Sequence, residues 1–191
     1  MKHVIVGASV AGITAAARIR ELSPQDEVLM LSGESVRPYG KMSLPYILSG
    51  MTWFDNCALQ VPKGVELRLG ATVDGLDTAA RTVHTSDGTV ESYDRLLIAT
   101  GTSPVIPQVP GSDLSSVVGI RNIGDIEVVR KCMASSSEKR VILSGAGLVN
   151  AEVGDALVKL GVPVTYVVSS NRVLSQIVDR EASAMIEQAL S

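Results

Sequence analysis

A glycine-bearing turn near the N-terminus limits the folds that this chain can adopt. The turn has the sequence Gly7-Ala8-Ser9-Val10-Ala11-Gly12, between an apolar run at 3–6 and helical spacing at 10–21, and a second apolar run spans 28–31. A strand, a glycine turn, a helix and a strand in this order predict a right-handed βαβ unit. The helix of such a unit begins at the turn, so its unpaired backbone N–H groups can bind a phosphate.

The positions within the turn suit a dinucleotide pyrophosphate. Gly7 would make the tight turn, and Gly12 would let the helix pack close to the strand. Ser9 replaces the middle glycine of the GxGxxG pattern and is small enough to admit a phosphate. The pattern alone is weak evidence, but the strand before it and the helix after it strengthen the prediction.

Glu34 lies just beyond the second predicted strand, 22 residues after Gly12. A carboxylate at this place can accept hydrogen bonds from both hydroxyls of an adenosine ribose. The alternative is a solvated loop acid. Together with the turn, Glu34 predicts a dinucleotide-binding site.

A second unit of similar design begins near residue 141. It contains an apolar run at 141–143, the turn Gly145-Ala146-Gly147-Leu148-Val149-Asn150, a helical pattern at 148–160 and an apolar run at 164–168. Asn150 replaces the third glycine and compromises close packing, unless its amide bonds the strand or a ligand. Two such units indicate two nucleotides, or one dinucleotide and a structural copy.

The segment after the last of these strands contains no acid. It has the sequence Val168-Ser169-Ser170-Asn171-Arg172, and without a carboxylate the recognition of NADH is weaker. The two serines and Arg172 could bind the 2′-phosphate of NADPH. The alternative is a polar turn with a solvated Arg172.

Composition narrows the function classes. Hydrophobic residues make up 46% and aromatic residues only 3%, which suits parallel strands buried on both faces. A net charge of −3 without a basic run argues against nucleic acid or an anionic membrane as partner. Cys57 and Cys132 lie far apart, which predicts a reduced, cytoplasmic protein without structural disulfides. His3 and His84 have no companions at metal-ligand spacing, so no metal site is predicted.

Between the two units the sequence predicts further short elements. Helices are expected at 44–48, 123–134 and 179–190, and strands at 65–69, 72–76, 81–84, 89–92 and 95–98. Asp87-Gly88 is a hairpin signal, either Asp125 or Asn122 is expected near the start of a helix, and a loop is expected at 135–137.

Four segments carry a resemblance to a known family: VIVGASVAGITAA, RPYGKMSLPYILSG, YDRLLIATGTSPVIPQVPG and VILSGAGLVNAEVGDAL. Over essentially its whole length the chain resembles the two-dinucleotide flavoprotein reductases of the pyridine nucleotide–disulfide oxidoreductase superfamily. The second segment is most similar to reductases of small electron carriers, such as rubredoxin, ferredoxin and nitrite reductase-type flavoproteins. The resemblance implies an α/β, Rossmann-like two-dinucleotide-binding flavoprotein fold, with an FAD domain at 1–112 and a partial NAD(P) domain at 113–191.

The resemblance also implies roles for single residues. Those expected to bind FAD are Gly7, Ala8, Ser9, Ala11, Gly12, Glu34, Arg37, Lys41, Val73, Ala99, Thr100 and Gly101. Those expected to face the pyrophosphate of NADH or NADPH are Gly145, Gly147, Leu148 and Val149. The catalytic candidates are Lys41, near the ribitol, pyrophosphate or isoalloxazine, and Glu152, near the nicotinamide. The alternative for Glu152 is a solvated helix acid favoured by the helix dipole.

Met42 stands where some relatives carry a redox cysteine, and no cysteine precedes Cys57. A thioether cannot act as a thiolate nucleophile. The resemblance therefore implies hydride transfer from NAD(P)H to FAD and onward electron transfer to a small redox protein or a small molecule. A thiol-linked reductase that uses Cys57 or Cys132 is an alternative.

The family continues with the rest of the NAD domain, a strand ending in Gly-Asp and an interface domain, none of which this sequence contains. We therefore expect a reductase that is incomplete at its C-terminus. The chain would be a truncated form of a longer protein, a natural half that pairs with another polypeptide, or a stand-alone relic. The expected partner is a completing polypeptide, or further copies of the chain in a homo-oligomer. A non-catalytic nucleotide-binding or scaffold subunit that binds FAD only is the second hypothesis. Asn150 and the missing acid after Val168 motivate it.

Overall fold

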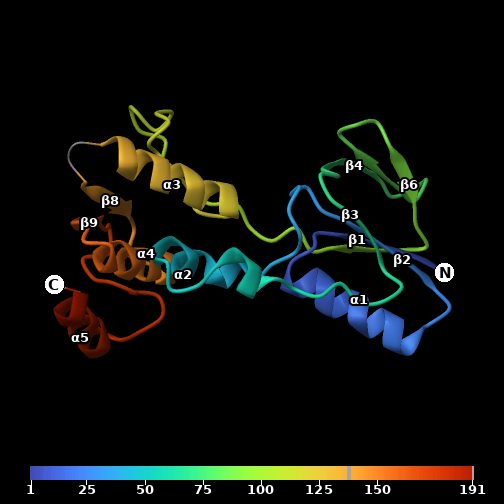
Figure 1. The fold of residues 1–191 in the computed structure, drawn as a ribbon, viewed down its shortest axis with the longest axis horizontal. Coiled ribbons are helices and arrows are strands. Elements are labelled where there is room, and N and C mark those ends of the chain that lie inside the picture. Colours follow the sequence, from blue (N-terminus) through green and yellow to red (C-terminus); the bar gives the residue numbers. More distant parts are fainter. Residues whose placement is uncertain (137–138, 191) are drawn as a thin grey trace. The chain divides into compact units, whose positions relative to one another are not determined.

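The computed structural model describes residues 1–136 and 139–190 and divides the chain into two compact units. Unit 1 comprises Met1–Lys41 and Phe54–Ser103, and unit 2 comprises Met42–Trp53 and Pro104–Ser191 (Figure 1). Unit 2 thus contains Met42–Trp53, a segment that lies within the predicted FAD domain.

Unit 1 is built on a four-stranded parallel sheet with the strand order β3-β2-β1-β7. Its strands are β1 (Lys2–Val6), β2 (Glu27–Leu31), β3 (Glu66–Arg68) and β7 (Arg95–Ile98). Helix α1 (Val10–Leu22) connects β1 to β2. The strand order therefore changes direction at β1, because β2 lies on one side of it and β7 on the other. The predicted α/β class and the first βαβ unit are confirmed.

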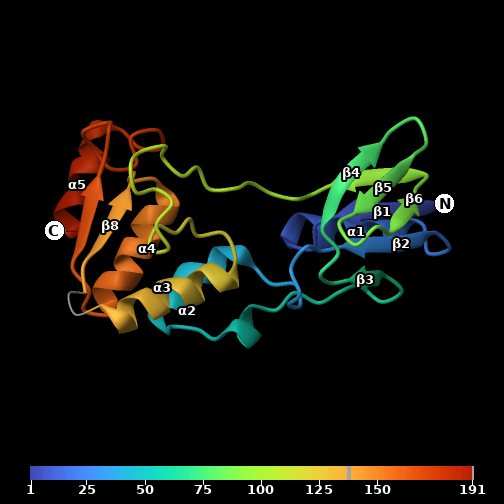
Figure 2. The ribbon, with the colours of Figure 1, turned by 90° about the horizontal axis from the view of Figure 1, so that it is seen from above.

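Both faces of the parallel sheet are covered over β1 and β2, whereas the edge strand β7 leaves Leu97 and Ile98 exposed. One apolar cluster contains Val4, Val6, Leu29, Leu31 and Val83, and the other contains Ile5, Ala16, Val28 and Met30. Ala16 comes from α1, which packs on the second face. Val83 comes from an antiparallel meander of β4 (Val73–Asp77), β5 (Thr82–Thr85) and β6 (Val90–Ser92), which covers the first face (Figure 2). Burial on both faces explains the continuous apolar runs of β1 and β2.

The hairpin between β5 and β6 turns at Asp87-Gly88, as predicted. Gly88 has a φ of 86°, and the Asp87 carboxylate accepts hydrogen bonds from the Thr85 hydroxyl and the Thr89 N–H. These bonds lower the pKa of Asp87 to about 2. Strand β5 begins one residue later than predicted, because Arg81 has a φ of 54° and belongs to the preceding turn.

Two charged clusters join the N-terminus to the rest of unit 1. The N-terminal ammonium and His3 lie 2.8 and 2.9 Å from the two carboxylate oxygens of Asp26. The Lys2 ammonium lies 2.7 Å from Glu91, which also pairs with Arg68. The pKa of Asp26 is lowered, chiefly by the hydrogen bond from the N-terminal ammonium. The pKa of Glu91 is lowered, chiefly by the hydrogen bond from Lys2.

These lowered pKa values predict a loss of stability in acid. Each carboxylate has a lower pKa in the folded chain than in the unfolded chain, so its contribution is complete above the unfolded value of about 4. The contribution is lost as the pH falls through the folded value. We expect the urea midpoint to fall between pH 5 and pH 3, and to fall less steeply in Glu91→Gln. Equal slopes in Glu91→Gln and the unsubstituted chain would contradict this assignment.

Unit 2 contains a two-stranded parallel sheet and four helices among its described residues. The strands are β8 (Val141–Ser144) and β9 (Val164–Val167), joined by α4 (Leu148–Lys159). The other helices are α2 (Leu44–Ser49), α3 (Ile123–Ser135) and α5 (Arg180–Leu190). Helix α2 packs against α3 and α4 (Figure 2), and the Arg130 guanidinium of α3 donates to the Ile47 carbonyl of α2.

Helix α3 begins as predicted, with a reciprocal cap. The Asn122 side chain accepts from the Asp125 N–H, and the Asp125 carboxylate accepts from the Asn122 N–H. The helix includes Ser135, which was predicted as loop, and Ser137 lies outside the described residues. Short 3-10 turns occur at Lys41–Ser43 and Phe54–Cys57. Within 1–136 and 139–190, no helix combines the length and apolarity that crossing a membrane requires.

Candidate functional site

The first glycine turn connects β1 to α1 and lies against the residue that follows β7. Gly7 has a φ of 113°, and a Cβ added to it would lie 2.2 Å from the Ala99 carbonyl oxygen. The Gly7 N–H donates to the Leu31 carbonyl over 2.8 Å, and the Ala99 N–H donates to the Val6 carbonyl over 2.7 Å. The turn thus lies at the carboxyl end of the sheet, at the change in strand order, which is where open α/β sheets bind ligands.

Gly12 brings α1 close to the turn. A Cβ added to Gly12 would lie 2.0 Å from the Gly7 carbonyl oxygen. Both glycines are therefore required by contacts with the backbone, in agreement with the roles that the sequence predicts for them. Ala8 packs at the edge of the cluster formed with Ala16, and Ala11 is exposed at the start of α1.

The N-terminus of α1 is open to a ligand. Ser9 occupies the N-cap position, but its hydroxyl donates to the Tyr39 carbonyl over 3.3 Å and does not cap the helix. Among the described residues, no side chain caps α1 and no acid lies in its first turn. The first N–H groups of a helix have no partner inside the helix. A phosphate therefore fits this end of α1 in charge and in hydrogen-bonding capacity.

Glu34 is held by two neighbours. Its Oε1 lies 2.6 Å from the Lys41 Nζ, and its Oε2 accepts a 2.8 Å hydrogen bond from the Tyr39 hydroxyl. The Glu34 side chain is 29% exposed. Tyr39 thus links Ser9 to Glu34, and Glu34 in turn pairs with Lys41. The role of Glu34 toward a ribose and the catalytic role of Lys41 stay predictions.

The other residues predicted to bind FAD lie nearby in unit 1. Arg37 pairs with Asp55, and its guanidinium carbon lies 5.5 Å from the centre of the Phe54 ring. Val73 begins β4, where it pairs with Thr85. Exposed Thr100 and Gly101 follow Ala99 at the end of β7, and Gly101 has a φ of 72°.

The second glycine turn has similar geometry at the end of β8. Gly145 has a φ of 88°, and its N–H donates to the Val167 carbonyl over 2.7 Å. The Asn150 amide donates to the Ser144 and Gly145 carbonyls over 2.7 and 2.9 Å, so it bonds the end of the strand. One of the two alternatives left open by the sequence, a bond to the strand, is therefore present.

The start of α4 leaves space for a ligand. Gly147 is its N-cap, and a Cβ added there would meet no other atom of the described chain within 4 Å. Leu148 and Val149 are each 55% exposed. This open helix N-terminus suits a pyrophosphate. Glu152 lies one turn further along α4 and is half-buried.

Arg172 binds the backbone of its own loop. Its Nη1 donates to the Val178 and Asp179 carbonyls, and its Nη2 donates to the Ser175 carbonyl over 2.6 Å. The expected solvated guanidinium is therefore not observed. A role toward a 2′-phosphate would have to compete with these three bonds.

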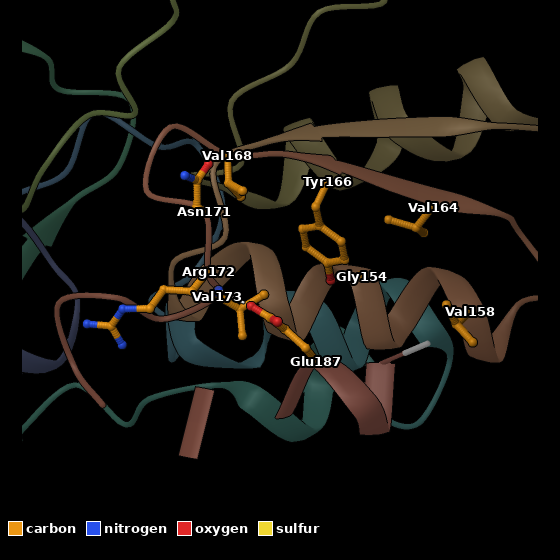
Figure 3. Close-up of a pocket in the computed structure, with 9 residues that line it drawn as sticks. All are labelled: Gly154, Val158, Val164, Tyr166, Val168, Asn171, Arg172, Val173 and Glu187. Carbon is orange, nitrogen blue, oxygen red and sulfur yellow. Dashed lines mark hydrogen bonds between the residues drawn. The ribbon is translucent and has the colours of Figure 1, made fainter. Parts of the chain in front are cut away.

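A pocket of about 560 Å³ lies between α4, β9 and the loop that precedes α5 (Figure 3). Its lining residues are Gly154, Val158, Val164, Tyr166, Val168, Asn171, Arg172, Val173 and Glu187. The Tyr166 ring points toward Gly154, and its hydroxyl donates to the Asn150 carbonyl over 3.2 Å (Figure 3). Burial raises the pKa of Tyr166.

Sequence reasoning missed Tyr39 and Gly154. Tyr39 lies in the segment RPYGKMSLPYILSG, but nothing in the sequence shows that its hydroxyl reaches Glu34. Gly154 lies inside a helical pattern, where a glycine costs about 1 kcal/mol relative to alanine. That cost was the available signal of a close contact.

The chain is similar to known proteins over its whole length. The family "Pyridine nucleotide-disulphide oxidoreductase" matches residues 1–191. The NADH-dependent phenylglyoxylate dehydrogenase subunit epsilon of Aromatoleum evansii is 33% identical over 98% of this chain and 45% of its own length. The benzene 1,2-dioxygenase system ferredoxin–NAD(+) reductase subunit of Pseudomonas putida is 28% identical over 99% of this chain and 47% of its own length.

Solved structures agree with the fold. A NAD-dependent persulfide reductase from A. fulgidus matches 100% of this chain and 38% of its own, with a TM-score of 0.91 and 25% identity. A water-forming NADH oxidase from Lactobacillus brevis, bound to NADH, matches 99% of this chain and 44% of its own, with a TM-score of 0.89 and 26% identity. The chain thus spans about half the length of the curated relatives that it matches.

Proposed function

The chain belongs to the pyridine nucleotide-disulphide oxidoreductase family, and from this premise we propose that it is an FAD-dependent oxidoreductase. It would pass electrons from NADH or NADPH through the flavin to a small electron carrier or another acceptor. No redox-active cysteine would take part. The observation that carries the proposal is the contact between Gly7 and Ala99, which places an open helix N-terminus at the change in strand order.

The residues of unit 1 would hold FAD at its adenosine end. The backbone of Ala8, Ser9 and Ala11 would face the pyrophosphate, because α1 offers its N–H groups there. Glu34 would accept from the ribose hydroxyls with the lone pairs that Tyr39 and Lys41 leave available. FAD, when bound, supplies the ability to accept two electrons and release them singly or in pairs.

The second turn would hold the nicotinamide nucleotide. Gly145 and Gly147 keep side chains away from the N-terminus of α4, and the pyrophosphate of NADH or NADPH would lie there. Glu152 would approach the nicotinamide. Because Arg172 binds three carbonyls of its own loop, we propose no preference for NADPH on its account.

Two features support a thiol-independent route to the acceptor. Met42 is 81% exposed and carries a thioether, which is not a thiolate nucleophile. Among the similar proteins are the ferredoxin–NAD(+) reductase subunit of P. putida and a rubredoxin–NAD(+) reductase, whose names give small redox proteins as partners. We propose a reducing, cytoplasmic setting, and a completing polypeptide or a second copy as a partner.

The test is anaerobic reduction of bound FAD. The chain loaded with FAD is mixed with NADH or NADPH. The absorbance of the oxidised flavin, at about 450 nm, is followed with time. We expect the absorbance to fall. In Gly147→Val, we expect unchanged FAD binding but slower reduction, because the added side chain occupies the open space at α4.

A second candidate function is an FAD-binding subunit without reductase activity. The absence of an acid in the segment 168–172 favours it, since NADH recognition commonly uses a carboxylate there. The relative from A. evansii is, by its name, one subunit of a larger enzyme. FAD binding without any reduction by NADH or NADPH would support this candidate and contradict the reductase.

A further inference from the structure

We propose that Tyr39 is a positioning residue that orients Glu34 toward the adenosine ribose of FAD and couples this carboxylate to the phosphate-binding turn. The inference rests on the proposed FAD site. It adds a residue that neither the sequence motifs nor the comparisons assign to that site.

Tyr39 is fixed on three sides. Its side chain is 2% exposed, and its ring packs edge-on against Phe54 with 5.1 Å between the ring centres. Its hydroxyl donates to the Glu34 Oε2 over 2.8 Å, and its carbonyl accepts from the Ser9 hydroxyl over 3.3 Å. The isolated bridge between Tyr39 and Ala58 further fixes its backbone. Because the ring cannot move freely, its hydroxyl defines where Glu34 can lie.

The two bonds to Glu34 leave it able to bind a ribose. An ionised carboxylate has about four acceptor sites, and Tyr39 and Lys41 use one site on each oxygen. The remaining sites can accept from the two ribose hydroxyls. A carboxylate with restricted rotation loses less entropy when a ligand binds, so the bond from Tyr39 favours binding through preorganisation.

The experiment compares FAD with its analogue that lacks the 2′-hydroxyl of the adenosine ribose. Both affinities are measured by flavin fluorescence with the full chain. Tyr39→Phe keeps the ring on Phe54 and removes only the hydroxyl. Tyr93→Phe is the matched control: it makes the same change in unit 1, at a residue that packs against the Val4 and Val6 cluster.

We expect the unsubstituted chain to bind FAD about tenfold more tightly than the analogue, the usual size for a hydrogen bond to a charged group. In Tyr39→Phe the affinity for FAD should fall about tenfold while that for the analogue stays within about twofold, so that the preference disappears. Tyr93→Phe should keep the preference. Adding Glu34→Gln to Tyr39→Phe should reduce the preference no further, because both changes act on one interaction.

Three results would overturn the inference while FAD binding itself persists. In the first, Tyr39→Phe keeps the preference for FAD. In the second, Tyr39→Phe weakens the binding of FAD and of the analogue equally, which is the result of a merely structural role. In the third, the unsubstituted chain binds both ligands equally, so that Glu34 has no role toward the ribose. Binding of neither ligand would instead contradict the proposed function.

Discussion

Replacing Gly7 by alanine is expected to abolish FAD binding and to destabilise the chain by about 3 kcal/mol. Two effects add at this position. A φ of 113° is strained for any residue with a Cβ, and the new Cβ would lie 2.2 Å from the Ala99 carbonyl oxygen. Since this oxygen belongs to the backbone that follows β7, relief would require β1 and β7 to separate at their carboxyl ends. That movement would open the site where the phosphate is proposed to bind.

Gly88→Ala is the matched control for Gly7→Ala. Gly88 also has a positive φ, 86°, but a Cβ there would meet no other described atom within 4 Å. This control should cost only about 1–2 kcal/mol, for the strained backbone alone, and leave FAD binding unchanged. Urea unfolding and FAD fluorescence would measure both variants. Equal effects of the two substitutions would mean that the contact between Gly7 and Ala99 does not shape the site.

Gly154→Ala is expected to destabilise unit 2, although alanine is normally the better helix former. In an ordinary helix interior this change stabilises by about 1 kcal/mol. Here the added Cβ would lie 1.8 Å from the Tyr166 hydroxyl oxygen and 2.7 Å from the ring carbon that bears it. Gly154 of α4 packs directly against Tyr166 of β9. We therefore expect the free energy of unfolding, measured in urea, to fall by about 1–3 kcal/mol.

A second substitution tests the cause of this loss. Tyr166→Leu removes the two closest of the three atoms that the new Cβ would meet and leaves only the Leu143 Cδ1 at 3.3 Å. It also removes the hydrogen bond to the Asn150 carbonyl. The double variant Gly154→Ala/Tyr166→Leu should therefore lose less stability than the sum of the two single variants. Additive losses, or a stabilising Gly154→Ala, would show that the ring does not press on α4.

The regular elements could be predicted because periodicity and turn residues determine them locally. The Arg95–Ile98 strand lies where it was predicted, and the first helix ends one residue later than expected. The reciprocal cap at Asn122 and Asp125 and the hairpin at Asp87-Gly88 also depend on residues close in sequence. Such contacts require no knowledge of the tertiary fold.

The contacts that shape the candidate site are long-range, and the sequence did not reveal them. The Ala99 oxygen meets Gly7 across 92 residues, and nothing in either segment shows how close they lie. Likewise the bond between Tyr39 and Glu34 depends on a chain reversal in an irregular segment. For Asn150 the sequence left two alternatives, a bond from its amide to the strand or to a ligand. The structure shows the bond to the strand.

We propose that the first turn and Glu34 form the adenosine-pyrophosphate part of an FAD site. Titration calorimetry of the purified chain with FAD tests this directly, with Gly7→Ala as the paired variant. We expect one FAD to bind per chain and Gly7→Ala to abolish that binding. An absence of FAD binding by the unsubstituted chain, or binding that Gly7→Ala leaves intact, would contradict it.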